Sequence, residues 1–318
     1  MTQQFLLVDL DGAAAEFVIG EAGRPLGPST IVACHDQAEL IDQLKSELGE
    51  TLGRIDAAAF AAPGPVVSGS LQLTHRTMRL EREALGWGLG IGRVELVNDF
   101  AARATAMPVL GPDQMELIGG EPPRSQDPAV AVGPSRTGLG VSMLNPDGFI
   151  GWVAVGGEGG HAELAAADHR EAEIIEVLRR TEAYVSPDRV LSEAGVVEVC
   201  GALHLLAGQA DAPCEIGDLV LAARGADPIA LETFTVFSTW LGAVAGDLAL
   251  VAGARSGAYI ISPVMLNWID LFDREACRRR FAAKGRMSHF MADIPLFLVT
   301  ERRCGLLGLA ARLASVRF

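Results

Sequence analysis

Two short segments of the chain carry the residue types best suited to chemistry. A strand-like apolar run ends in Asn98 and Asp99, which places an amide and a carboxylate at the end of a predicted buried strand. Farther along, residues 156–161 read Gly-Gly-Glu-Gly-Gly-His, so that Glu158 and His161 lie among four glycines. A carboxylate base and side chains that bind hydroxyls suit phosphoryl transfer to a hydroxyl-bearing substrate.

Asp99 has two roles that the sequence leaves open. A helical run begins at Phe100, and aspartate is a favoured N-cap, so Asp99 is a candidate helix cap. Ligand sites in α/β folds lie at the carboxyl ends of strands, and Asp99 holds such a position. On this second interpretation, Asp99 accepts the hydroxyl proton during phosphoryl transfer.

The glycines of residues 156–161 predict an unusual backbone. Glycine is typical of positive φ angles and of places where the backbone approaches a ligand closely. A flexible loop is the alternative, but the segment lies between well-patterned elements. We therefore expect Glu158 and His161 to bind the hydroxyls of a sugar.

Two further segments are candidates for phosphate and metal contacts. Asp9 and Asp11 are two residues apart, so on a strand they face the same side, where Mg²⁺ takes one or two carboxylates. The Asp-Gly pair ending at Gly12 is equally typical of a tight hairpin turn. Thr137 and Gly138 offer hydroxyl and amide donors to a phosphate, or form a second hairpin.

Strands and helices alternate around these segments. In the first part of the chain we expect strands at 5–9, 15–19, 57–62 and up to 97, and helices at 38–52 and 100–107. In the second part we expect strands at 128–132, 140–144, 258–261 and 294–299, and helices after Asp168, at 231–252 and at 306–314. This alternation predicts an α/β fold with partly parallel sheets, and the turn-rich residues 111–127 are the candidate domain crossing.

Composition narrows the class of protein. The chain has 318 residues, enough for two domains, and its net charge of −14 argues against nucleic acid or an anionic membrane as the main partner. The apolar residues 240–254 contain Asp247 and three glycines, which favours a buried helix over a membrane span. The start of the chain is typical of a first strand rather than a signal peptide. Five scattered cysteines without a Cys-x-x-Cys pair predict reduced thiols in a cytoplasmic protein and no zinc site.

Taken together, the motifs resemble the bacterial glucokinase family, within the actin/hexokinase-like sugar kinase superfamily. They run in order over almost the whole chain: Asn98-Asp99-Phe100, Thr137-Gly-Leu-Gly140, Gly157-Glu-Gly-Gly-His161, Arg189-Val-Leu-Ser192, Lys284-Gly-Arg286, Asp293-Ile-Pro295 and Gly305-Leu-Leu-Gly308. The resemblance implies two ribonuclease-H-like domains flanking a central cleft, a small one at 1–110 plus 300–318 and a large one at 111–299. It also implies transfer of the γ-phosphate of ATP to the 6-hydroxyl of glucose, with Mg²⁺, in a homodimer.

The resemblance also implies roles for individual residues. Asp99 matches the catalytic base, and Asn98, Glu158 and His161 match sugar-binding residues. Asp188 stands where the family uses glutamate to contact the sugar, so it keeps the charge with one methylene less. The retained positions of the nucleotide loops are Asp9, Gly12, Thr137 and Gly138, with Asp9 also the expected metal contact.

The nucleotide loops depart from the family pattern. Residues 9–14 read Asp-Leu-Asp-Gly-Ala-Ala in place of Asp-x-Gly-Gly-Thr-Asn, and residues 134–138 read Pro-Ser-Arg-Thr-Gly in place of Gly-x-Gly-Thr-Gly. Residues 261–264 lack the usual Gly-Gly pair, and residues 74–78 read Thr-His-Arg-Thr-Met in place of Thr-Asn-His-x-Trp. The first of these changes places Asp11 in a loop expected to bind phosphate. A carboxylate about 4 Å from a phosphate disfavours binding by on the order of 4 kcal/mol at an effective dielectric constant of ~20.

Two functions therefore remain open. One is a glucokinase whose affinity for ATP is reduced; the other is a non-catalytic hexose-binding sensor derived from a glucokinase. A family member that binds neither ligand is disfavoured, because the base and the sugar ligands are kept together. The acidic Asp11 and the basic Arg136 appear in two loops that face each other in the family. We therefore also expect an ion pair between them that fills the phosphate site.

Overall fold

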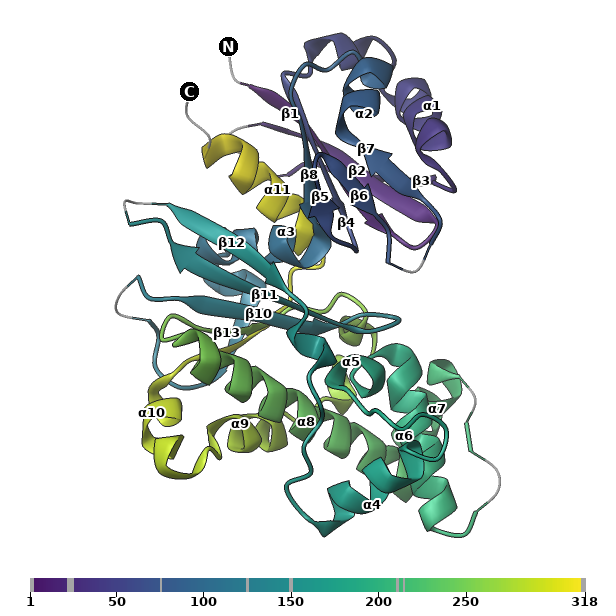
Figure 1. Cartoon of the computed structure of the whole chain (residues 1–318), viewed down its shortest axis with the longest axis vertical. Helices are drawn as coiled ribbons and strands as arrows, with labels where there is room; N and C mark the ends of the chain where they lie inside the picture. Colours follow the sequence, from purple (N-terminus) through teal and green to yellow (C-terminus); the bar gives the residue numbers. More distant parts are fainter. Residues whose placement is uncertain are drawn as a thin grey trace. The chain divides into compact units, whose positions relative to one another are not determined.

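The chain forms two compact units in its computed structural model (Figure 1). The structure describes residues 3–21, 26–74, 76–123, 126–148, 151–209, 212–213 and 215–315. Unit 1 contains Met1–Leu110, Asp147–Gly156 and Arg303–Phe318, and unit 2 contains Gly111–Pro146 and Gly157–Arg302. Each unit contains strands and helices, as expected for an α/β chain of this length.

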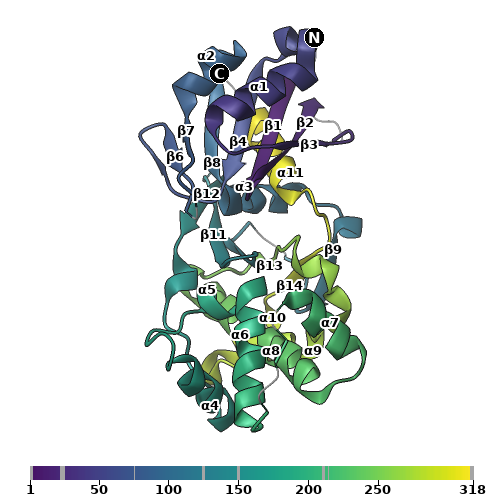
Figure 2. The same ribbon diagram turned by 90° about the vertical axis from the view of Figure 1, so that its right-hand side faces the viewer.

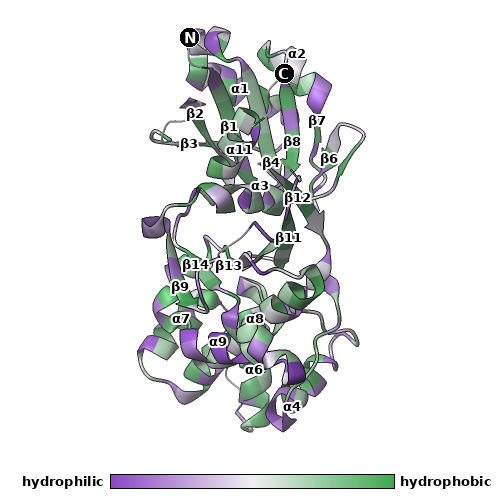
Figure 3. Cartoon of the chain, turned by 90° about the vertical axis from the view of Figure 1, so that its left-hand side faces the viewer, coloured by the Kyte–Doolittle hydropathy of each residue, from purple (hydrophilic) through white to green (hydrophobic). Residues whose placement is uncertain are grey.

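Unit 1 is built on a five-stranded sheet in the order β3-β2-β1-β4-β8. The strands are β1 (Gln4–Asp11), β2 (Ala14–Glu21), β3 (Thr30–Ala33), β4 (Ala57–Ala62) and β8 (Val94–Asn98). Strands β1, β4 and β8 are parallel to one another, whereas β2 pairs antiparallel with β1 and β3. The inner strand β4 is buried along its whole length and is mostly hydrophobic in Figure 3. The predicted α/β class with a partly parallel sheet is confirmed.

Helices cover both faces of this sheet. One face packs against α1 (Gln37–Leu48) and α2 (Arg82–Leu89) through a core of leucines. The other packs against α3 (Asp99–Ala106) and α11 (Cys304–Ser315), which lie side by side. Figure 2 shows α11 beside α3 at this sheet. The C-terminal helix thus joins a sheet formed by the first hundred residues. A small antiparallel sheet of β5 (Val66–Val67), β6 (Ser70–Gln72) and β7 (Arg79–Glu81) completes unit 1.

The first helix is shorter than its apolar spacing predicted. Asp36 caps α1 by accepting a hydrogen bond from the backbone N–H of Glu39. The helix ends before Gly49, whose φ of 51° lies in the left-handed region that favours glycine. The chain continues from there as a 3₁₀ helix, Gly49–Arg54. The expectation of one helix over 38–52 was therefore wrong at its C-terminal end, because apolar spacing continues through the glycine stop.

The second sheet has six strands in the order β12-β11-β10-β13-β14-β9. Its strands are β9 (Met115–Gly119), β10 (Ala129–Pro134), β11 (Leu139–Pro146), β12 (Trp152–Gly157), β13 (Gly257–Ile260) and β14 (Leu296–Val299). The β9 strand lies within the turn-rich residues 111–127, which we expected to be the domain crossing and in which we predicted no strand. It pairs antiparallel with β14, and this partner from the far end of the chain is not visible in local sequence.

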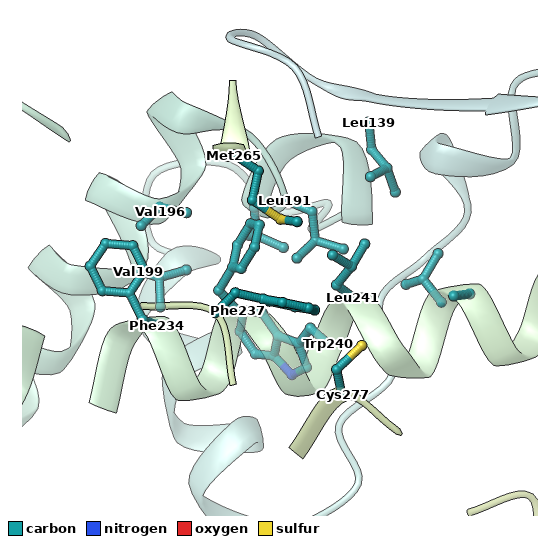
Figure 4. Close-up of a cluster of buried hydrophobic side chains, with 14 of the residues drawn as sticks. Leu139, Leu191, Val196, Val199, Phe234, Phe237, Trp240, Leu241, Met265 and Cys277 are labelled. Carbon is teal, nitrogen blue, oxygen red and sulfur yellow. The ribbon is translucent and has the colours of Figure 1, made fainter. Parts of the chain in front are cut away.

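A helical layer forms the core of unit 2. Its helices are α4 (His169–Leu178), α5 (Pro187–Val190), α6 (Glu193–Leu206), α7 (Ile216–Arg224), α8 (Pro228–Ala252), α9 (Arg274–Ala282) and α10 (Ser288–Asp293). Figure 4 shows Phe237, Trp240 and Leu241 among the buried side chains of this core. Within the described part of the chain, α8 is the one helix long and apolar enough to cross a membrane. Most of its apolar stretch is buried inside the unit.

The predicted cap at Asp168 is confirmed, because its side chain accepts a hydrogen bond from the backbone N–H of Glu171 at the start of α4. The four cysteines that the structure describes, Cys34, Cys200, Cys277 and Cys304, are all buried and not in disulfide bonds. Cys214 lies outside the described residues.

Candidate functional site

The junction of β8 and α3 holds the candidate base. Asn98, not Asp99, caps the helix: its Oδ1 accepts hydrogen bonds from the backbone N–H groups of Phe100 and Ala101, at 3.0 and 3.1 Å. Its Nδ2 donates to the carbonyl oxygen of Gly64 at 3.2 Å. The interpretation of Asp99 as the cap was therefore wrong. With the capping role taken by its neighbour, the Asp99 carboxylate is available for chemistry.

Asp99 is paired with a cation one helical turn along α3. Arg103 Nη1 donates to Asp99 Oδ2 at 2.7 Å, and the side chains are only 12% and 13% exposed. The guanidinium of Arg103 also lies 4.7 Å from the centre of the Phe100 ring. Burial disfavours the guanidinium charge, but the neighbouring charges of Asp99 and Asp9 outweigh it and raise the pKa of Arg103. Sequence reasoning missed this residue, although the Asp-x-x-x-Arg spacing was visible.

Asp9 lies near the end of β1 in a desolvated position. Its Oδ1 is buried and has no hydrogen-bond partner among the described residues. A Cβ atom at Gly305, in the first turn of α11, would lie 2.2 Å from Asp9 Oδ2, so only glycine fits beside this carboxylate. Burial is the main cause that raises the pKa of Asp9 to about 7; Arg103 acts in the opposite direction, and Asp99 adds to the rise.

The turn after Asp9 is a tight hairpin. Asp11 pairs with Ala14 across the β1–β2 ladder, and Gly12 adopts a φ of 59° between them. The hairpin interpretation is thus confirmed, and it is compatible with a loop that contacts phosphate. Arg76 Nη1 donates to the carbonyl oxygens of Gly12 and Cys34, at 2.7 and 2.8 Å, and ties the turn to the 74–78 segment. His75 of that segment lies outside the described residues.

Three predicted sugar ligands lie together in unit 2. His161 Nε2 is 3.8 Å from Glu158 Oε2, and His161 Nδ1 is 3.8 Å from Asp188 Oδ2. The backbone N–H of His161 donates to the carbonyl oxygen of Glu158 at 3.0 Å, within a short 3₁₀ turn, Gly159–His161. Tyr184 fixes the same turn, because its hydroxyl donates to the carbonyl oxygen of His161 at 2.8 Å. Glu158 and His161 are exposed, as ligands of a soluble sugar need to be.

Close packing explains at least one of the glycines around Glu158. None of the glycines in residues 156–160 adopts a positive φ. A Cβ atom at Gly160 would lie 2.5 Å from the carbonyl oxygen of Leu139 in β11. The turn therefore packs against the protein's own backbone. Of the two causes expected for these glycines, the positive φ was wrong, and the close approach to a ligand stays a prediction.

Asp188 connects this group to the predicted phosphate loop. Its Oδ1 accepts a hydrogen bond from the backbone N–H of Leu139 at 2.8 Å. A Cβ atom at Gly138 would lie 2.3 Å from the same oxygen, so the glycine makes room for the carboxylate. One carboxylate oxygen of Asp188 thus braces the 137–138 loop while the other faces His161.

The backbone amide donors of that loop are occupied in this structure. Ser135 Oγ accepts hydrogen bonds from the backbone N–H groups of Thr137 and Gly138, at 3.3 and 3.1 Å. It also donates to the carbonyl oxygen of Gly138 at 3.0 Å. Ser135 was not singled out from the sequence. Because it satisfies the amides expected to bind phosphate, a phosphate must displace it.

The two altered loops of unit 2 are tied to each other. Ser262 Oγ donates to the carbonyl oxygen of Pro134 at 2.6 Å and accepts from the backbone N–H of Met265 at 3.1 Å. A Cβ atom at Gly133 would lie 1.9 Å from the carbonyl oxygen of Ile261. The replacements at Pro134 and Ser262 therefore form one hydrogen-bonded arrangement.

The described residues contain no group of three or more histidine, cysteine or acidic side chains that could hold an ion. Mg²⁺ in phosphoryl-transfer enzymes is held by one or two carboxylates together with phosphate oxygens and water. The buried, unpartnered Oδ1 of Asp9 fits this mode. Arg136 and Asp11 belong to different units, and their ion pair stays a prediction.

Comparisons with known proteins identify the family. A glucokinase family model matches residues 6–316. The chain is 37% identical to a glucokinase of Nitrobacter hamburgensis, covering 98% of this chain and 97% of the relative. It is 40% identical to a glucokinase-like protein of Caulobacter vibrioides, covering 86% and 84% of the two chains.

Among solved structures, a glucokinase from an Antarctic psychrotroph superposes with a TM-score of 0.86 at 25% identity, covering 99% of this chain and 100% of that one. The predicted actin/hexokinase-type α/β fold is confirmed by this similarity. By its sequence and its fold, this chain belongs to the glucokinase family.

Proposed function

We propose that this protein phosphorylates glucose on its 6-hydroxyl, with ATP as the phosphoryl donor and Mg²⁺ as the divalent metal. The observation that carries the proposal is the Asp99 carboxylate at the carboxyl end of β8, relieved of helix capping by Asn98. Family membership over residues 6–316 supports the same reaction. The comparisons give the sensor alternative no support.

In this mechanism Asp99 is the general base. As the 6-oxygen of glucose attacks the γ-phosphorus of ATP, its proton passes to Asp99. The bond from the γ-phosphorus to the bridging oxygen breaks, and ADP leaves with that oxygen. When bound, Mg²⁺ neutralises phosphate charge, and Asp9 is the residue proposed to hold it.

Sugar binding is assigned to Glu158, His161, Asp188 and Asn98. Ionised carboxylates accept hydrogen bonds from sugar hydroxyls, and the imidazole can donate or accept. Asn98 has less to offer, because its Oδ1 caps α3 and one of its Nδ2 hydrogens binds Gly64. Its second Nδ2 hydrogen is the group proposed to reach the sugar.

The nucleotide contacts are assigned to Gly12, Thr137 and Gly138. For these amides to bind phosphate, Ser135 Oγ must give up the N–H groups of Thr137 and Gly138. Each exchanged hydrogen bond offsets part of the gain from the phosphate, by about 1 kcal/mol. We therefore propose a KM for ATP above that of relatives with the unaltered loops.

The experiment is a coupled assay of glucose 6-phosphate formation with purified protein and millimolar Mg-ATP. The Asp99→Asn variant keeps the shape of the side chain and removes the base, so turnover is expected to fall about 10²- to 10⁴-fold. Titration calorimetry with glucose alone shows whether the variant still binds sugar. Glucose binding by the wild-type protein without any glucose 6-phosphate formation would instead favour the sensor.

Two further properties are proposed with the activity. We propose a homodimer, as the resemblance to the family implies, and light scattering on the purified protein tests it. A cytoplasmic location fits an enzyme that draws on cellular ATP, and fractionation of cells that express the tagged protein tests it.

A further inference from the structure

A buried ion pair adjoins the proposed base, and the proposed mechanism does not use its cation. Arg103 lies one turn along α3 from Asp99, so that both side chains project from the same face of the helix. The contact of 2.7 Å between Arg103 Nη1 and Asp99 Oδ2 is largely shielded from solvent. Shielding keeps the interaction strong, since salt and water screen it little.

The ion pair with Arg103 gives the two oxygens of the Asp99 carboxylate different surroundings. Oδ2 of Asp99 is held by the guanidinium, and no described protein group donates to Oδ1. The pair therefore limits rotation about the Cβ–Cγ bond of Asp99. One oxygen is anchored, and the other is left to accept a proton from a substrate hydroxyl.

Arg103 is itself held in place by its surroundings. Its guanidinium lies over the ring of Phe100, in the helical turn that carries Asp99. On its backbone side, Cys304 Sγ donates to the carbonyl oxygen of Arg103 at 3.7 Å, a long contact acceptable for sulfur. Close packing of α11 at Gly308, where a Cβ atom would lie 1.7 Å from the carbonyl oxygen of Ala102, restrains the same stretch of α3.

Stability alone is a poor explanation for this pair. A buried ion pair is often no more stabilising than apolar side chains of similar volume, because both charges lose their hydration. Arg103 Nε is buried without a hydrogen-bond partner among the described residues, which adds a further cost. A cost of this kind next to a reacting group is typical of a site that is organised for function.

We propose that Arg103 is a positioning residue for phosphoryl transfer, which holds Asp99 Oδ2 so that Oδ1 faces the hydroxyl to be phosphorylated. This inference rests on the proposed role of Asp99 as the base. Arg103 does not touch substrate, so it acts on turnover through Asp99. A loss of orientation of this kind lowers kcat and leaves the sugar ligands of unit 2 unchanged.

The test compares Arg103→Met and Arg103→Lys in the coupled assay. Methionine replaces the apolar stem of the side chain without its charge, and kcat is expected to fall between about 10- and 100-fold. KM for glucose, and glucose affinity by calorimetry, are expected to change less than about threefold. Lysine restores a cation near Asp99 Oδ2 and is expected to recover part of the lost kcat.

A matched control separates positioning from general stability. Arg312 Nε pairs with Glu95 Oε2 at 2.7 Å in the same unit, away from the proposed base. Arg312→Met removes an ion pair of the same length, although a more exposed one, and is expected to keep kcat at the wild-type value. Melting temperatures of all variants show whether any loss of turnover follows a loss of folded protein.

The results distinguish a failure of the proposed base, Asp99, from a failure of the proposed positioning role of Arg103. If Asp99→Asn retains wild-type turnover, the proposed base is wrong, and the role of Arg103 falls with it. If Asp99→Asn is inactive while Arg103→Met keeps wild-type kcat, only the positioning role is overturned. A drop in kcat that lysine does not relieve, or that comes with an equal loss of glucose affinity, also overturns it.

Discussion

At the scale of single residues, the molecule places carboxylates in contrasting surroundings. Asp99 has a buried cation beside it, Asp188 accepts a backbone N–H, and Asp9 has a buried oxygen with no donor among the described residues. Each of these aspartates is therefore suited to different chemistry by the groups around it. Two predictions follow from individual side chains.

The first concerns the stability of the protein against pH. Because the pKa of Asp9 is raised from 3.8 to about 7, the folded state favours the protonated carboxyl. Its contribution to stability is complete below pH 3.8 and is lost as the pH rises through about 7. In Asp9→Asn this loss is removed. At about pH 8 the variant is therefore expected to unfold at higher urea concentration than wild type, and its free energy of unfolding is expected to be higher by at most ~4 kcal/mol.

At about pH 4 the difference is expected to shrink towards zero. Asp42→Asn, an exposed position on α1, is the control and is expected to show no such pH-dependent gain. Urea unfolding of the three proteins at both pH values provides the measurement. Equal stability of Asp9→Asn and wild type at about pH 8 would contradict the buried, destabilised carboxylate.

The second concerns Asp188, which faces both His161 and the 137–138 loop. Asp188→Asn keeps an oxygen that accepts the Leu139 N–H but removes the charge near His161. Asp188→Ala loses both. Losing a hydrogen bond to a charged acceptor costs about 1.5–3 kcal/mol, so KM for ATP is expected to rise at least about tenfold in Asp188→Ala.

In Asp188→Asn the rise in KM for ATP is expected to be much smaller, while KM for glucose rises in both variants. Steady-state kinetics with each substrate varied in turn provides the measurement. An equal rise in KM for ATP in the two variants would mean that the brace on Leu139 does not act on the nucleotide.

At the scale of elements, close helix packing positions the base. Helix α3 carries Asp99 and Arg103, and α11 packs against it through Gly308. The same first turn of α11 brings Gly305 against Asp9. A helix from the end of the chain therefore sets the surroundings of two aspartates from its first hundred residues.

This packing predicts opposite effects for two glycine-to-alanine changes in helices. Gly308→Ala inserts a methyl group 1.7 Å from a backbone oxygen, and it is expected to destabilise the protein by more than ~2 kcal/mol. Gly201→Ala lies in α6 with no atom within 4 Å of the new methyl group, and it is expected to stabilise by about 0.5–1 kcal/mol. Urea unfolding distinguishes the two, and a neutral Gly308→Ala would contradict the close contact of α11 with α3.

At the scale of the whole molecule, the proposed reaction draws residues from both units. Asp99 and Asn98 belong to unit 1, and Glu158, His161 and Asp188 belong to unit 2. Substitutions of Asp99 in unit 1 and of Glu158 in unit 2 are therefore expected to differ in which kinetic constant they change.

Glu158→Gln is expected to weaken glucose binding by about tenfold, because a charged acceptor becomes a neutral one. Asp99→Asn is expected to retain glucose binding while losing turnover. Calorimetry with glucose and the coupled assay on both variants make the comparison. Loss of glucose binding in Asp99→Asn alone would reverse the two assignments.

The sequence by itself determined the class of fold and most of its elements. The pattern of apolar residues predicted β4, α8 and α11 within a few residues of their observed bounds, because buried positions are apolar and their spacing follows the type of element. The ordered motifs also placed the chain in its family. Local pattern was misleading at Gly49, where apolar spacing runs past the helix end, and within 111–127, where a strand depends on a distant partner.

Only the tertiary structure decided the surroundings of the candidate site. It showed that Asn98 caps α3 and that a buried cation pairs with Asp99. It also showed that Gly160 and Gly138 are needed because other protein atoms lie where a Cβ atom would be. The desolvation of Asp9 needs α11, which the chain supplies some three hundred residues later. Such properties depend on which distant segments come into contact, and spacing along one chain does not encode that directly.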